Sequence, residues 1–75
     1  MSKATTIISG YLIELDTDGD STDCYISYND HGTFYTASLA AADATGMLED
    51  RNGRERRIPA STIDRITDWA VAYGY

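Results

Sequence analysis

The sequence STIDRITDWAVAYG, at residues 61–74, decides how the rest of the chain must fold. Its apolar side chains recur at the three- and four-residue spacing of one helix face: Ile63, Ile66, Trp69, Ala70 and Tyr73. Ser61, with Asp64 three residues later, is close to a capping box, and Gly74 is placed to end the helix. We therefore expect an amphipathic C-terminal helix that lies across an apolar surface, with Ile63, Ile66 and Trp69 as its anchors.

The first half of the chain, rich in β-branched and aromatic residues, predicts that surface. Residues 5–15 (TTIISGYLIEL) indicate one long strand in which Gly10 marks a bulge or a close approach. The odd positions of this strand share one face: Ile7, Tyr11, Ile13 and Leu15. Residues 22–29 and 33–38 indicate two further strands, separated by short glycine-containing turns. The expected product is a three-stranded antiparallel meander.

The middle of the chain predicts two short elements. Residues 39–44 (LAAADA) favour a single helical turn that Ser38 caps. Residues 46–58 indicate a short hairpin around Asn52-Gly53, which Pro59 ends. The sequence thus predicts one α+β domain over residues 1–75, in which a small antiparallel sheet (three-stranded meander plus short hairpin) is covered by a C-terminal α-helix.

Charge is distributed unevenly along the chain. Residues 1–50 hold nine acids and one base, Lys3, whereas residues 51–75 are net positive, and the whole chain carries −6. Such a field repels nucleic acid and anionic membranes and attracts basic surfaces. Cys24 is alone, which excludes an intrachain disulfide and fits a reducing compartment. No leader or transmembrane run is apparent, so we expect a cytoplasmic protein.

The acidic run DTDGD, at residues 16–20, invites a calcium-binding interpretation. An EF-hand loop that starts at Asp16 or at Glu14 misplaces the aliphatic residue and the final Glu that the loop requires. A solvated hairpin tip with at most weak cation association is the favoured interpretation, and we expect no specific metal site.

No catalytic constellation accompanies these acids. His31 lies beside Asp30 in a predicted turn, where neighbouring side chains splay outward into solvent. Cys24 is expected to be a small buried hydrophobic residue, since the surrounding acids raise the pKa of a thiol. We therefore expect a protein that is not an enzyme and uses no cofactor.

Two further groups of residues have a functional and a structural interpretation. Tyr25 and Tyr28 alternate on one strand, so at least one is expected to be exposed, either as an interface anchor or as an ordinary cross-strand contact. Four arginines surround the Asn52-Gly53 turn: Arg51, Arg54, Arg56 and Arg57. They could grip phosphate, but two other interpretations are favoured because the molecule as a whole is anionic: neutralisation of the acidic half, or protection of an edge hairpin against pairing with other strands.

The acidic surface itself is the strongest functional indication. Carboxylates spaced along strands and turns can stand in for the phosphates of duplex DNA and be steered to a basic channel. We expect the contact residues to be Asp16, Asp18, Asp20, Asp23, Asp30 and Tyr25, extended by Asp43, Glu49 and Asp50.

In size, acidity and lack of catalytic residues, the chain resembles the phage-encoded anti-CRISPR proteins, several of which are DNA mimics. Its C-terminal part, GMLEDRNGRERRIPASTIDRITDWAVAYGY, is similar to the hairpin-plus-helix endings of small phage and mobile-element proteins. The resemblance implies a non-enzymatic inhibitor in the bacterial host cytoplasm. Its acidic surface would block a basic nucleic-acid-binding protein, such as a CRISPR-Cas effector, without binding nucleic acid or membrane.

The alternative is a small acidic structural or regulatory domain that acts through homo-oligomerisation or another protein contact. Acidity then serves solubility alone. Both interpretations are compatible with a monomer or a homodimer.

Overall fold

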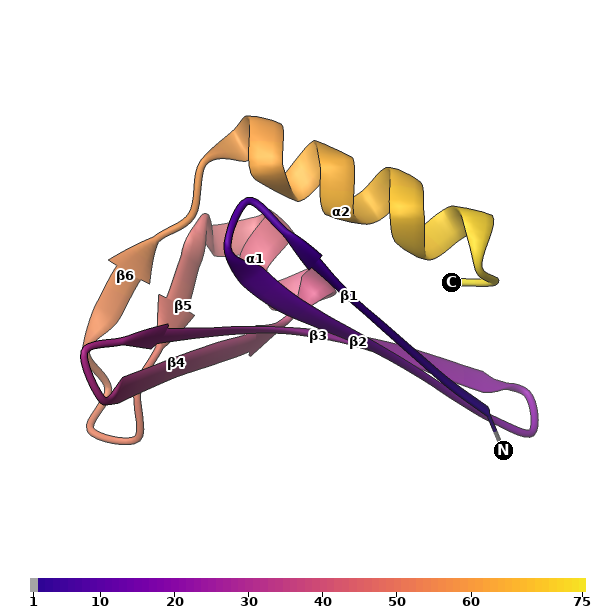
Figure 1. The fold of residues 1–75 in the computed structure, drawn as a ribbon, viewed down its shortest axis with the longest axis horizontal. Coiled ribbons are helices and arrows are strands. Elements are labelled where there is room, and N and C mark those ends of the chain that lie inside the picture. The colour runs from indigo at the N-terminus through magenta and orange to yellow at the C-terminus, as the bar shows by residue number, and fades with distance from the viewer. Residues whose placement is uncertain (1) are drawn as a thin grey trace.

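The computed structural model describes residues 2–75 and has one antiparallel sheet with two helices (Figure 1). The elements are β1 (Ser2–Ile8), β2 (Tyr11–Asp18), β3 (Ser21–Asp30), β4 (Thr33–Ser38), α1 (Leu39–Thr45), β5 (Met47–Glu49), β6 (Glu55–Arg57) and α2 (Ala60–Ala72). The six strands lie in chain order across the sheet, and α1 is inserted between β4 and β5. The α+β class is confirmed, but the meander and the hairpin belong to a single continuous sheet.

The prediction of one long strand over residues 5–15 is wrong. The chain reverses at Ser9-Gly10, so that β1 and β2 form a hairpin with Ile8 opposite Tyr11. Ser9 (φ 52°) and Gly10 (φ 86°) both have left-handed backbone, the combination that a type I′ turn requires. The predicted shared face is therefore wrong for Ile7, which is exposed, whereas Tyr11, Ile13 and Leu15 are buried together.

Both helices pack on one face of the sheet and enclose a single core (Figure 1). Ile13 of β2, Ile26 of β3, Leu48 of β5 and Ile66 of α2 have essentially no exposed surface. Ile63 and Ala70 are buried beside Ile66, and Trp69 is half-buried at the margin. The amphipathic pattern of residues 61–74 is thus explained by burial against the sheet.

The ends of the helices follow local hydrogen bonding. Ser38 caps α1 as predicted, because its Oγ accepts a hydrogen bond from the backbone N–H of Ala41 at 3.1 Å. The predicted Ser61 cap of α2 is wrong: the helix begins after Pro59, whose carbonyl accepts the N–H of Ile63. At the other end, Tyr75 N–H donates to Ala70 and Gly74 N–H donates to Val71, a Schellman motif.

Within residues 2–75, neither helix is long and apolar enough to span a membrane.

Replacement of Ile66 by Ala tests the packing of α2 on the sheet. Ile66 is fully buried, so Ile66→Ala should lower the free energy of unfolding by about 3 kcal/mol in urea denaturation. Val71 lies on the same helix but is 58% exposed, so Val71→Ala should cost less than about 1 kcal/mol. Equal losses for the two variants would contradict the described packing.

Candidate protein-binding face

The sheet face turned away from α1 and α2, here called the open face, has no cover from any element of residues 2–75 (Figure 1). Its members alternate along the strands with the core residues and pair with one another across the sheet. The residues of the open face include Lys3, Thr5, Ile7, Leu12, Glu14, Asp16, Asp18, Asp23, Tyr25, Phe34 and Glu49. The open face is therefore a surface that the fold leaves to solvent or to a partner.

Five carboxylates lie on the half of the β2–β3 hairpin that contains its connecting turn, and we call this group the acidic strip. It consists of Glu14, Asp16, Asp18 and Asp23 on the open face and Asp20 in the connecting turn. Within residues 2–75, Lys3 is the only base that makes an ion pair with the strip, and its Nζ is 2.9 Å from Glu14 Oε2. The hydrogen bond and the charge of Glu14 raise the pKa of Lys3, so Lys3 stays protonated and offsets one of the five charges.

Asp16 and Asp23 lie directly opposite each other on β2 and β3. Like charges in opposed positions on a sheet destabilise it, by an amount on the order of 0.2–1 kcal/mol. Residues that break a local rule of folding are often found at functional sites. The strip is therefore the strongest candidate for a functional surface.

Apolar side chains lie on the same face as the strip. Ile7 is 71% exposed, Leu12 38%, Tyr25 43% and Phe34 55%. Ile7 is opposite Leu12, and Tyr25 is opposite Glu14, so apolar groups adjoin the acids. Exposed aromatic residues bordered by charge are typical of protein interfaces.

The other predicted contact residues do not join the strip. Asp30 points to the helix side, where its Oδ2 is 2.8 Å from Nη1 of Arg56. Asp43 lies exposed on α1, on the opposite side of the sheet. Glu49 is on the open face beyond Thr36. Asp50 accepts hydrogen bonds from the backbone N–H groups of Asn52 and Arg54, and so holds its own turn.

Sequence reasoning left out four open-face residues that the structure groups with Tyr25: Ile7, Leu12, Glu14 and Phe34. Glu14 was detectable, because Glu14, Asp16 and Asp18 repeat at the two-residue period of one strand face. The exposure of Ile7 and Leu12 depends on the unpredicted reversal at Ser9-Gly10.

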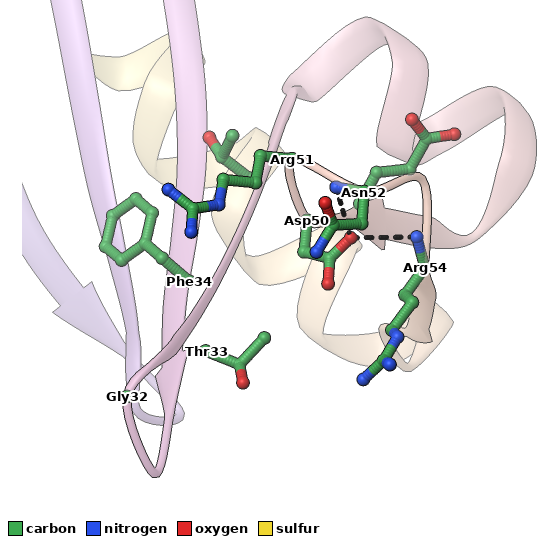
Figure 2. Close-up of a pocket in the computed structure, with 9 residues that line it drawn as sticks. Gly32, Thr33, Phe34, Asp50, Arg51, Asn52 and Arg54 are labelled. Carbon is green, nitrogen blue, oxygen red and sulfur yellow. Dashed lines mark hydrogen bonds between the residues drawn. The ribbon is translucent and has the colours of Figure 1, made fainter.

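A cleft of about 640 Å³ opens between β4 and the β5–β6 turn, at the other end of the open face (Figure 2). Figure 2 shows the Arg51 guanidinium directed toward Phe34, and the Asp50 carboxylate bonded to the turn. Arg51 and Arg54 line this cleft and make no ion pair within residues 2–75. Neutralisation, one of the two favoured interpretations of the arginines, thus applies to Arg56, which bonds to Asp30 and lies 4.4 Å above the Tyr28 ring.

The two side chains considered as catalytic groups, His31 and Cys24, do not lie together in a cleft. His31 is at an exposed turn tip, 3.9 Å from Asp30. Cys24 is buried in the core, and that burial, rather than the neighbouring acids, raises the pKa of its thiol. Among residues 2–75, no group of three His, Cys, Asp or Glu side chains is arranged to hold a metal ion.

No protein-family model matches the sequence, and comparisons with curated proteins and with solved structures also return no match. Function is therefore inferred from the geometry and charge of the open face.

Replacement of Asp23 by Lys tests the unfavourable pair. The lysine would face Asp16, so Asp23→Lys should raise the free energy of unfolding by about 0.5 kcal/mol at low salt, and by less at high salt. Asp20→Lys changes the net charge equally, but Asp20 lies in the turn and has no opposed acid, so its gain should be smaller. A destabilised Asp23→Lys protein would show that the pair does not weaken the fold.

Proposed function

We propose that the protein is a non-enzymatic inhibitor whose open face binds a basic, nucleic-acid-binding surface on another protein and blocks that surface. The observation that carries the proposal is the acidic strip with its opposed Asp16–Asp23 pair. A cytosolic CRISPR-Cas effector is the first target class to test, because the chain resembles phage-encoded anti-CRISPR proteins in size and acidity.

The charge density of the strip supports this proposal. From Glu14 to Asp18 the strand advances about 13 Å at about 3.3 Å per residue. Duplex DNA carries about eight charges over that length, at about one charge per 1.7 Å. Four of the strip's carboxylates lie within that length, and with Lys3 offsetting one of them they reach about two-fifths of that density. A channel built to hold DNA would therefore attract the strip.

The apolar residues of the open face would supply binding energy that the charges alone do not provide. Electrostatic attraction raises the rate of encounter, whereas buried aromatic and aliphatic side chains account for most of the binding energy. Tyr25 adjoins the strip and is the proposed anchor, with Leu12 and Ile7 in the next row of the sheet. Inhibition in this proposal is steric and electrostatic occlusion, with no turnover and no cofactor.

A charge-reversal series tests the proposal. The strip variant Asp16→Lys/Asp18→Lys/Asp23→Lys and the helix variant Asp43→Lys/Asp64→Lys/Asp68→Lys both change the net charge from −6 to 0. The three helix acids are exposed on α1 and α2, away from the open face. Each tagged protein is used to capture partners from a nuclease-treated bacterial lysate that contains CRISPR effectors, at low and at high salt.

We expect wild type and the helix variant to retain the same basic nucleic-acid-binding protein at low salt and to lose it at high salt, and the strip variant to retain none. Added wild-type protein should then compete with DNA for the captured partner. Equal capture by both variants would show that the strip is not the contact, and capture without competition would show that the contact is not inhibitory. Circular dichroism confirms that each variant is folded.

A further inference from the structure

Among residues 2–75, the outer edge of β1 is the one long strand edge that no other strand of the sheet pairs with. β1 and β6 are the two edge strands. β6 has three residues, all charged, which is a common protection against edge pairing. β1 has seven residues, with Lys3 as its only charge, no proline, and four consecutive β-branched residues from Thr5 to Ile8. A strand of this composition at a free edge is a template for pairing with another strand.

The strand register identifies which backbone groups of β1 are free. Ile8 and Tyr11 close a two-residue hairpin loop, so these two residues exchange both of their hydrogen bonds. Bonded and non-bonded pairs alternate from there, so Thr6 and Ala4 also bond to β2. The N–H and C=O groups of Lys3, Thr5 and Ile7 consequently point outward, and all three residues are exposed.

Apolar groups border this edge on both sides. On the open face, Ile7 is 71% exposed. On the helix side, Arg65 of α2 donates a hydrogen bond to Ser9 Oγ at 2.7 Å, which places that flank of α2 beside the end of β1. Trp69 and Tyr73 follow Arg65 at four-residue intervals on the same flank, with ring centroids 5.0 Å apart, and Tyr73 is 61% exposed.

We propose that two copies of this chain associate through their β1 edges as a two-fold symmetric dimer. Thr5 of one protomer lies opposite Thr5 of its partner, and Lys3 lies opposite Ile7. The two-fold axis produces the Lys3–Ile7 pair twice, so three residue pairs exchange about six hydrogen bonds. The two sheets join into one, both open faces lie on the same side, and the Trp69–Tyr73 flanks border the joint on the other.

A second copy fits this edge better than a foreign strand does. Foreign strands are selected by pockets for alternate side chains. The arginine-lined cleft and a smaller hollow beside Ile58 and Ile63 both lie away from β1. Identical edges need no pockets, because symmetry matches them. β1 also carries no acid, so it is a favourable line of approach for two molecules of charge −6.

The dimer is independent of the proposed inhibition, and salt distinguishes the two. Screening weakens the repulsion between two −6 molecules, so dimerisation should strengthen as salt rises, whereas capture of a basic partner should weaken. Sedimentation velocity on the purified protein over a wide concentration range, at low and at high salt, measures the first effect without any partner present.

Variants at Thr5 test the interface. Thr5→Pro removes an outward N–H and no bond to β2, so it should raise the dimer dissociation constant about tenfold or more while the circular dichroism spectrum stays folded. Thr5→Val keeps the N–H and should still dimerise. Thr5→Lys places two lysines opposite each other at the symmetry axis and should be a folded monomer, which keeps the test valid if the proline variant unfolds.

Wild-type protein that remains monomeric at every concentration and salt would overturn the proposal and leave the edge to a strand from another protein. A dimer that persists in folded Thr5→Pro or Thr5→Lys would place the interface elsewhere on the molecule.

Discussion

The packing of both helices onto one face of a six-stranded sheet is the constraint on which the rest of the structure depends. Ile66 of α2 is enclosed with Ile13 and Ile26 of the central strands, and these contacts remove the apolar side of the sheet from water. The opposite side has no cover within residues 2–75, so its side chains are free of the demands of a core. The acidic strip and the exposed Tyr25 and Phe34 lie on this side.

Local patterns in the sequence were sufficient for the elements that local interactions determine. The three- and four-residue spacing of residues 61–74, the Ser38 cap and the Asn52-Gly53 hairpin all act within a few residues, and the structure confirms each. The first hairpin was missed because residues on either side of Ser9-Gly10 are equally β-branched. Gly10 is equally compatible with a bulge inside one strand and with a turn between two strands. Only the pairing of β1 with β2 shows that it forms a turn.

The candidate site required the register of the whole sheet. Asp23 and Asp30 belong to the same strand, but their positions differ by an odd number, so their side chains lie on opposite faces of the sheet. Asp23 lies opposite Asp16 on the open face, and Asp30 bonds to Arg56 on the helix side. The composition of the strip was therefore predictable only in part, from the two-residue period that Asp16 and Asp18 share. The open face combines charge for attraction with exposed apolar groups for binding energy, which makes it suited to a protein partner.

Methyl NMR of the protein bound to its captured partner tests most directly whether the open face is the contact. The Leu12 methyl groups report on the open face, and the Val71 methyl groups, 58% exposed on α2, report on the helix side. If the open face is the contact, partner binding shifts or broadens the Leu12 signals and leaves the Val71 signals unchanged. Perturbation of Val71 with no change at Leu12 would contradict this prediction, because the partner would then bind the helices rather than the uncovered sheet.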